Sequence, residues 1–267
     1  MHEGDLDIKS NEANPARIYD YYLGGKNNFP ADRALAEQIL AIAPESRDNA
    51  QVNRAFLRRA VRFLAGEAGI RQFLDIGSGL PTQGNVHEVA QAAAPGASVA
   101  YVDNDPVVLT HGRALLTGDH LAIVRADLRD PEQILEHPEV RKELDFAQPV
   151  GLLLVAILHF VGDEDDPAGI LARLREALAP GSYLVISHAT ADFDPERAVE
   201  AIKLYKGAKA PLTPRSLAQV ERFFEGFELL EPGVVQLPRW RPDAETRTPA
   251  YPVPILGGVG RIGSTTP

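Results

Sequence analysis

The stretch from Arg71 to Gly84 constrains the fold of this chain more than any other. A short apolar strand over residues 73–76 carries one acid, Asp75, and ends in a turn with glycines at Gly77 and Gly79. The next residues are apolar at three- and four-residue spacing, which is typical of an amphipathic helix. Glycines allow a tight turn and a close approach of a ligand to the backbone, and a helix N-terminus presents free N–H groups. Strand, turn and helix together predict the opening unit of a nucleotide-binding α/β fold.

The details of this turn disfavour NAD as the ligand. The dinucleotide fingerprint G-x-G-x-x-G requires a third glycine where this chain has Thr82. An acid two residues before the first glycine is instead the pattern D-x-G-x-G, and residues 75–79 resemble that pattern as it occurs in class I methyltransferases that use S-adenosylmethionine (SAM). A strand-to-helix turn without any ligand is the alternative interpretation.

Length and composition exclude several classes of protein. A chain of 267 residues, 45% of them hydrophobic, can form one well-packed α/β domain with an appendage. The net charge is −10 and no lysine- or arginine-rich block occurs, which disfavours a nucleic-acid partner. The absence of cysteine excludes disulfides and thiolate metal sites. No segment approaches the roughly 20 apolar residues of a membrane span, and the N-terminus is unlike a signal peptide, so we expect no membrane association and a cytoplasmic protein.

Strands and helices alternate along most of the chain. After residues 73–76, further strands are expected at 98–103, 121–125, 150–158 and 182–187, with helical patterns between them. This alternation predicts a doubly wound, Rossmann-like and mostly parallel sheet with an antiparallel last strand. Residues 227–230 and 234–237 are expected to pair with each other as closing strands. The expected organisation is a flexible tail (1–14), an N-terminal helical cap (15–68), a core (69–256) and a loose, glycine-rich tail (257–267).

Acidic residues stand at the predicted ends of successive strands. In open α/β sheets, ligands bind outside the carboxyl ends of the strands. Asp103 follows the second strand, where its carboxylate can accept hydrogen bonds from ribose hydroxyls, with Asn104 beside it. Asp127 and Leu128 follow the third strand and resemble the methyltransferase motif that contacts adenine. The alternative is that these acids only form turns and helix caps before Pro106 and Pro131.

A histidine follows the fourth predicted strand. His159 has a side chain that titrates near neutrality and is therefore the candidate general base. The alternative is a histidine bonded to the backbone and packed on Phe160. The acidic run at residues 163–166 precedes Pro167 and is interpreted as a helix cap, so no metal site is expected.

Four motifs together resemble one protein family. They lie at residues 17–29, 73–85, 101–106 and 158–160. On these motifs the chain is identified as a member of the actinobacterial SAM-dependent methyltransferase family long labelled DUF574, from about residue 15 to at least residue 237. The resemblance implies the class I methyltransferase fold and SAM as cosubstrate. It implies that Asp75, Gly77, Ser78 and Gly79 hold the methionine end of SAM, and it leaves the acceptor open.

The resemblance also gives the N-terminal segment an expected role, because such a segment can close over the methionine end of SAM. Arg17 would then bind the SAM carboxylate, while Tyr19, Tyr21, Asn28 and Phe29 would wall the site and exclude water from the sulfonium cation. The alternative is that these residues fasten the cap to the sheet. Tyr22 stands where many members are expected to have leucine.

Three hypotheses for function follow. The leading one is methyl transfer from SAM to a small-molecule acceptor. The second is a non-catalytic regulator that binds SAM or S-adenosylhomocysteine (SAH). The third, an NAD-linked oxidoreductase, is disfavoured by Thr82. The sequence does not indicate an oligomeric state.

Overall fold

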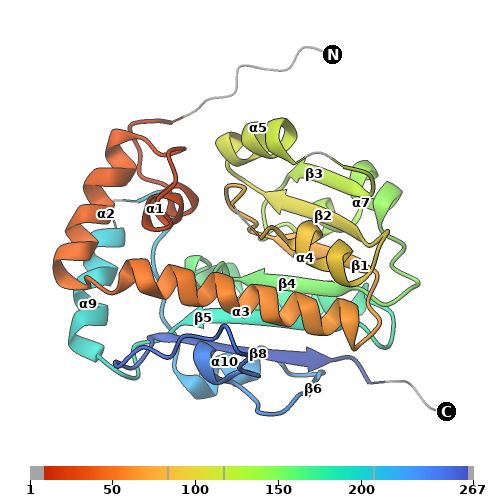
Figure 1. Ribbon diagram of the computed structural model, residues 1–267. Coiled ribbons are helices and arrows are strands. Elements are labelled where there is room, and N and C mark those ends of the chain that lie inside the picture. The colour runs from red at the N-terminus through yellow and green to blue at the C-terminus, as the bar shows by residue number, and fades with distance from the viewer. Residues whose placement is uncertain (1–8, 83, 117, 207, 264–267) are drawn as a thin grey trace.

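The computed structural model describes residues 9–263, except residues 83, 117 and 207. Its centre is an eight-stranded sheet of order β3-β2-β1-β4-β5-β8-β6, with β7 paired to β8 beside this path (Figure 1). The parallel strands are β1 (Gln72–Ile76), β2 (Ser98–Asp103), β3 (Leu121–Arg125), β4 (Gly151–Val155) and β5 (Tyr183–Ala189). The strand order reverses between β1 and β4, which opens a crevice at their carboxyl ends. The predicted doubly wound sheet is confirmed.

The antiparallel edge of the sheet corrects two predictions. β8 (Ile255–Arg261) lies between β5 and β6 (Glu228–Leu229), and β7 (Val235–Gln236) also pairs with β8. The prediction that residues 227–230 and 234–237 pair with each other was therefore wrong, and so was the loose tail from residue 257. The glycines of β8 explain the error: a Cβ on Gly257 would lie 2.4 Å from Leu237 Cδ2, and one on Gly260 2.8 Å from Phe227 Cβ. Glycine here permits close packing on the strand, although by composition it indicates a loose segment.

Helices cover both faces of the sheet, as strands buried on both sides require. One face carries α3 (Ser46–Gly66), α4 (Val86–Ala93) and α5 (Pro106–Leu115). The other carries α6 (Pro131–Leu135), α7 (Pro138–Glu143), α8 (Pro167–Glu176) and α10 (Leu217–Arg222). Three short 3-10 helices are η1 (Leu158–Phe160), η2 (Asp163–Asp165) and η3 (Leu237–Arg239). None of the helices in the described part of the chain has the length and apolarity to cross a membrane.

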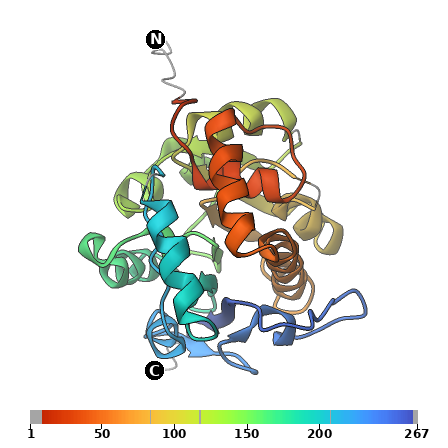
Figure 2. The same cartoon turned by 90° about the vertical axis from the view of Figure 1, so that its left-hand side faces the viewer.

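A cap of three helices stands over the carboxyl edge of the parallel strands. It consists of α1 (Pro15–Tyr22), α2 (Pro30–Ile42) and α9 (Pro195–Tyr205), which pack around a separate apolar cluster. Figure 2 shows α2 and α9 standing side by side, although the sequence separates them by about 150 residues. The predicted cap of residues 15–68 needs correction on two points. α3 packs on the sheet with the core, and α9 joins the cap.

The N-terminal boundary also differs from the prediction. Residues 1–8 of the expected flexible tail lie outside the described residues. Ala13 and Asn14 are buried, and the Asn14 side chain accepts a hydrogen bond from the Ala16 N–H at the start of α1. The prediction of a flexible tail was therefore wrong for the residues next to α1, because a helix N-terminus gains a capping acceptor from Asn14.

Candidate functional site

A cavity of about 640 Å³ lies between the cap and the carboxyl ends of the five parallel strands, β1 to β5. The strand-end residues predicted from the sequence come together along one side of it. These are Asp75, Gly77, Ser78, Gly79, Asp103, Asn104, Asp127 and Leu128. The parallel register of β1, β2 and β3 explains this gathering, because it aligns their carboxyl ends at one edge.

The glycine turn after β1 is held tightly against β2. Gly77 and Gly79 have φ angles of +74° and +67°, a region that favours glycine. The N–H groups of Gly77 and Ser78 both donate to the carbonyl of Val102, at 2.8 and 3.2 Å. A Cβ on Gly77 would lie 2.5 Å from the Ile157 side chain, whereas one on Gly79 would meet no atom within 4 Å. The turn therefore leaves open space beside the backbone at Gly79.

Two buried carboxylates flank this turn. Asp103 accepts the Gly79 N–H at Oδ2 and the Asp105 N–H at Oδ1, both at 2.9 Å. Burial raises the pKa of Asp103 to about 6 in spite of these bonds. Burial raises the pKa of Asp75 further, to about 7, while the positive charge of Arg54 acts in the opposite direction. Both acids are thus poorly solvated and gain from a polar or cationic partner.

Asp127 has the opposite electrostatic setting. Arg129 donates to both of its oxygens, from Nε at 2.9 Å and Nη2 at 2.7 Å, and Asn104 Nδ2 donates to Oδ2 at 2.9 Å. Burial acts to raise the pKa of Asp127, but these hydrogen bonds and the Arg129 charge hold it well below its usual range. The carboxylate is therefore ionised and fixed in orientation at the edge of the cavity.

A polar stripe on α3, which was not predicted from the sequence, also lines the cavity. Asn49, Asn53 and Arg54 face the cavity from this helix. Asn53 donates to the Tyr19 hydroxyl at 2.9 Å and accepts from the Ser187 hydroxyl at 2.6 Å. Arg54 donates to the Gly84 carbonyl at 3.1 Å, while its Nε is buried without a partner among the described residues. In the sequence, the four-residue spacing of Asn49 and Asn53 beside the apolar stripe of this helix could have indicated that both face the same side.

Only one of the predicted residues of the N-terminal segment lines the cavity. Tyr19 does so, and its hydroxyl donates to the Ala50 carbonyl at 2.9 Å. Tyr21 is bonded to Glu37, and Asn28 donates to Asp20 at 2.8 Å. Phe29 packs on the cluster that contains Leu80, Val107 and Val108. Tyr22, which the sequence analysis left without a role, lines the cavity with Tyr19.

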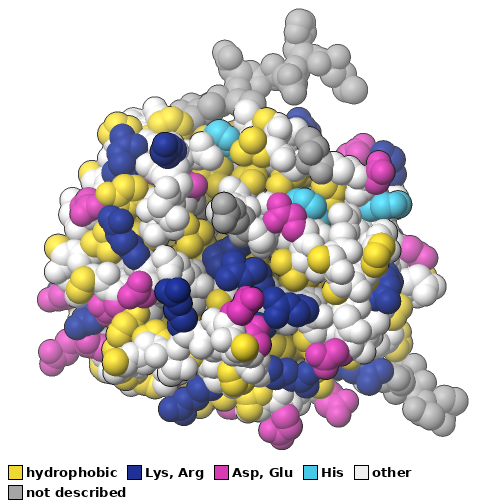
Figure 3. Space-filling model, viewed as in Figure 1, with side chains coloured by type: hydrophobic (Ala, Val, Ile, Leu, Met, Phe, Trp, Pro, Cys, Tyr) yellow, Lys and Arg dark blue, Asp and Glu magenta, His cyan; other side chains and the backbone are white. Residues whose placement is uncertain are grey.

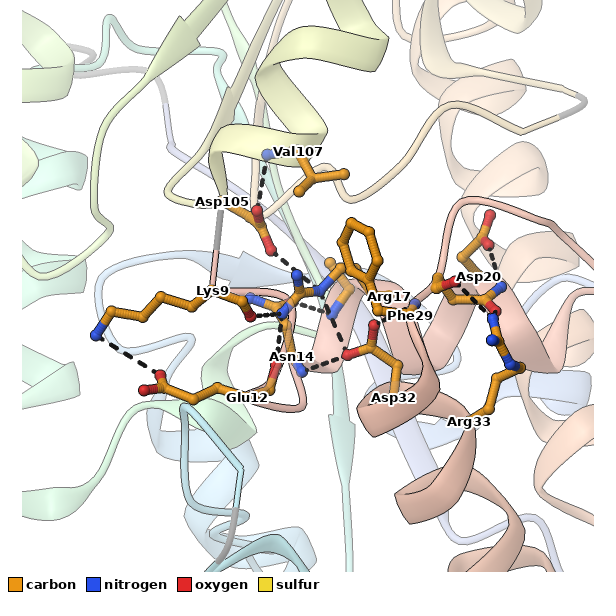
Figure 4. Close-up of polar contacts among 12 residues, drawn as sticks. Lys9, Glu12, Asn14, Arg17, Asp20, Phe29, Asp32, Arg33, Asp105 and Val107 are labelled. Carbon is orange, nitrogen blue, oxygen red and sulfur yellow. Dashed lines mark hydrogen bonds and ion pairs between the residues drawn. The ribbon is translucent and has the colours of Figure 1, made fainter. Parts of the chain in front are cut away.

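Arg17 also lies away from the cavity, in a network that joins the cap to the core (Figure 4). Its Nε is 3.3 Å from Asp32 Oδ1 and 3.7 Å from Asp105 Oδ2, and all three side chains are almost fully buried. Its Nη2 donates to the carbonyls of Glu12 and Lys9, at 2.7 and 3.2 Å. Asp105 directly follows the strand-end pair Asp103 and Asn104. These contacts match the alternative role, fastening of the cap, and not the expected contact with a ligand carboxylate.

His159 lines the cavity on its β4 side. Its Nδ1 accepts the N–H of Ala189 at 3.2 Å, which leaves the proton of a neutral ring on Nε2. Burial, together with the nearby His188 and Arg215, lowers the pKa of His159 well below its usual value. Protonation of Nδ1 would break the bond to Ala189. The geometry therefore suits a hydrogen-bond donor better than the general base suggested by the sequence.

His188 and Arg215 are buried, and Arg215 is hydrogen-bonded to the backbone next to His159. Arg215 donates to His188 Nε2 at 3.1 Å and to the carbonyls of Leu158 and Val161, at 3.1 and 3.0 Å. These bonds fix the chain on both sides of His159. Over the described ranges, no group of three or more side chains of the metal-binding types is close enough to hold an ion.

Comparisons with known proteins concern the family and the fold of the chain. The model of the S-adenosyl methyltransferase family matches residues 1–263. The crystal structure of a DUF574 family protein from Streptomyces avermitilis MA-4680 is 46% identical, with a TM-score of 0.92, and the match covers 95% of this chain and 99% of that one. A protein from Thermobifida fusca YX, provisionally described as a methyltransferase, is 45% identical with a TM-score of 0.89, over 97% of both chains.

A more distant similarity concerns the fold alone. Human N-acetylserotonin methyltransferase in complex with SAM is 14% identical with a TM-score of 0.51, and the match covers 97% of this chain and 65% of that one. No curated protein matches the chain.

The family model and the two close structures extend over nearly all of the sequence. The chain therefore belongs to the S-adenosyl methyltransferase family, also labelled DUF574, whose members are SAM-dependent methyltransferases of the class I fold.

Proposed function

We propose that this methyltransferase transfers the methyl group of SAM to a small-molecule acceptor. The observation that carries the proposal is that polar strand ends line one side of the cavity and the cap lines the other. Its volume of about 640 Å³ falls in the range of roughly 300–1,000 Å³ typical of small-molecule sites. The face seen in Figure 3 mixes basic and acidic side chains, with a small basic group over α3. Together with the net charge of −10, this mixture argues against a nucleic-acid acceptor.

The methionine end of SAM fits Asp75 and Arg54. Asp75 is a buried carboxylate that gains from a cation, and the buried Nε of Arg54 lacks an acceptor among the described residues. An α-amino acid group supplies both partners, because its ammonium carries a positive charge and its carboxylate a negative one. We therefore assign the ammonium to Asp75 and the carboxylate to Arg54, in place of the Arg17 role expected from the sequence.

The nucleoside end fits the acids of β2 and β3. We assign Asp103 and Asn104 to the ribose, because each Asp103 oxygen accepts one backbone N–H and keeps a second lone pair. We assign Asp127 and the backbone of Leu128 to adenine. Gly77, Ser78 and Gly79 pass beside the ligand, where the open space at Gly79 admits a close approach.

The protein contributes mainly by positioning. SAM supplies an activated methyl group on a sulfonium, and well-oriented partners gain on the order of 7–11 kcal/mol over free encounter. Tyr19 and Asn53 hold the cap side of the cavity against β5 through Ser187. His159 presents an Nε2–H donor to the cavity and acts as a hydrogen-bond donor, not as a base.

Calorimetry with SAM tests the proposal. Wild-type protein is expected to bind SAM, and Asp103→Ala to bind it at least about tenfold more weakly, because a charged acceptor of hydrogen bonds is lost. Asp130→Ala is the matched control, since Asp130 caps α6 outside the cavity lining. Absence of wild-type binding, or equal affinity of Asp103→Ala, would refute the assignment. Tight SAH binding without methyl transfer from labelled SAM to any small molecule of a cell extract would favour the regulatory alternative.

A further inference from the structure

The cap side of the cavity contains a group of uncharged side chains from four separate segments. This group, called here the acceptor subsite, consists of Tyr22, Ile39, Phe160, Ala201, Tyr205 and Leu212. Five of the six pack in one apolar cluster, and Ala201 lies one helical turn before Tyr205 on α9. The ring centroids of Phe160 and Tyr205 are 5.6 Å apart, and the Phe160 ring is 4.5 Å from that of His159. The subsite therefore borders His159 and contains three aromatic rings that line the cavity.

The charged side chains that line the cavity near the subsite already face charges of opposite sign. The charge of Lys209 acts on the strand-end carboxylate of Asp103 and lowers its pKa. Arg197 is paired with Glu45, and its Nε lies 3.2 Å from Asp194 Oδ2. The six residues of the subsite carry no charge. A charged ligand would lose its hydration there without gaining an opposite charge, which is costly in an apolar site. An uncharged aromatic molecule would instead gain from burial and from offset or edge-on ring contacts.

The Tyr22 hydroxyl is a buried polar atom of the subsite. The Tyr22 side chain is 8% exposed, and its hydroxyl has no hydrogen-bond partner among the described residues. Burial raises the pKa of Tyr22, so the hydroxyl keeps its proton and acts as a donor. A buried hydroxyl without a partner has lost its hydrogen bonds to water and gained none from the protein, which is unfavourable. A ligand that brings an acceptor atom to Tyr22 would recover part of that loss.

We propose that the acceptor subsite selects compact, uncharged aromatic molecules that carry a hydrogen-bond acceptor atom, which the Tyr22 hydroxyl binds. The inference rests on the proposed function, since it assumes that SAM occupies the strand-end side of the same cavity. The subsite then decides which molecule is placed against the methyl group. Tyr22 is a specificity-determining residue in this assignment, and a member of the family with leucine there would lack the donor.

Ligand binding to the SAH-saturated protein tests the proposal by equilibrium dialysis. Isoquinoline is the probe, because it is compact, aromatic and uncharged at neutral pH, and its ring nitrogen is a hydrogen-bond acceptor. We expect saturable binding that is at least roughly tenfold tighter than that of N-methylisoquinolinium or isoquinoline-1-carboxylate, its cationic and anionic relatives. Ala201→Trp should fill the subsite and abolish binding, while Val199→Trp on the exposed side of α9 should not.

Tyr22→Phe isolates the hydrogen bond. In this variant isoquinoline should bind about three- to tenfold more weakly, whereas naphthalene, which lacks the nitrogen, should be unaffected. The inference is overturned if isoquinoline does not bind to the SAH-bound protein, or if it binds to Ala201→Trp as well as to wild type. It is also overturned if the charged relatives bind as tightly as isoquinoline. It is also overturned if Tyr22→Phe keeps the preference for isoquinoline over naphthalene. Failure of SAH itself to bind would overturn the proposed function instead.

Discussion

The two walls of the cavity are built on different physical principles. The strand-end wall is polar, and its acids Asp75, Asp103 and Asp127 come from consecutive βα units of one sheet. The cap wall is mostly apolar and aromatic, and it combines α1 and α2 with α9 from much later in the chain. The sheet topology alone places the first wall. The second wall depends on contacts between segments that are distant in the sequence.

The difference also concerns how each wall is held. Local hydrogen bonds hold two of the strand-end acids: the N–H groups of Gly79 and Asp105 donate to Asp103. The side chains of Arg129 and Asn104 donate to Asp127. The cap is fastened by the buried ion pairs of Arg17 with Asp32 and Asp105 (Figure 4). The cap is therefore joined to the loop that carries the proposed ribose site. Substitutions should therefore distinguish the two walls. Changes that loosen the cap should lower the unfolding free energy, and changes at the strand ends should lower the affinity for SAM and SAH.

Loss of Arg17 is expected to have the largest effect. Arg17→Met leaves Asp32 and Asp105 buried without their cation, and breaking a buried ion pair costs about 3–5 kcal/mol of unfolding free energy. Arg47→Met is the matched control, since it removes only the exposed ion pair with Glu37 and should cost less than about 1 kcal/mol. Urea denaturation of both variants measures the difference. Equal stabilities would show that the network does not hold the cap.

Asp75→Asn should weaken SAH binding by at least roughly 30-fold, because a buried charged partner of the ammonium is lost. The same variant should stabilise the free protein. The folded-state pKa of about 7 lies above the unfolded value of 3.8, so ionisation of Asp75 reduces stability as pH rises through this window. The gain of Asp75→Asn should therefore be full above about pH 7 and vanish near pH 4 in thermal unfolding experiments.

Asp127→Asn is the control, because its effect on stability near pH 7 should be opposite to that of Asp75→Asn. Its pKa is held below the usual value by Arg129, so its carboxylate contributes stability at neutral pH that is lost as pH falls. Asp127→Asn should consequently be less stable than wild type near pH 7. A stabilising effect there, or a destabilising one for Asp75→Asn, would contradict the electrostatic difference between these two strand ends.

The affinity for SAH should itself depend on pH. Binding of an ammonium requires ionised Asp75, so the affinity should rise roughly tenfold between about pH 5.5 and 7 and then level off. Calorimetry in two buffers of different ionisation enthalpy would also count the protons released on binding. A flat profile would mean that Asp75 does not meet the cation.

The smallest effect is expected at Arg129. Arg129→Ala removes a half-exposed partner of Asp127 and should raise the Asp127 pKa toward its usual value. SAM affinity should change by less than about fivefold, since exposed ion pairs contribute at most about 1 kcal/mol. Arg173→Ala, which breaks an exposed pair with Glu132, is the matched control. A loss of more than a hundredfold would place Arg129 itself against the ligand.

The sequence predicted the parallel part of the fold and the strand-end wall. Local patterns sufficed, because the period of apolar residues identifies each βα unit and the topology then aligns the strand ends. Asp75 and the glycine turn could be recognised from a five-residue motif. The same local patterns failed for β8, where glycine-rich sequence predicted a loose tail. The close packing of Leu237 and Phe227 against these glycines exists only in the folded chain.

Only the tertiary structure decided the cap wall. Tyr19 and Tyr21 are neighbours on α1 with similar chemistry, yet Tyr19 lines the cavity and Tyr21 is bonded to Glu37. Arg17 became a structural ion pair because folding brings Asp105 to it across 88 residues. Local sequence determines where a strand ends and which residues stand there. Long-range packing decides which face of a cap helix lines the cavity. Local sequence patterns do not predict it.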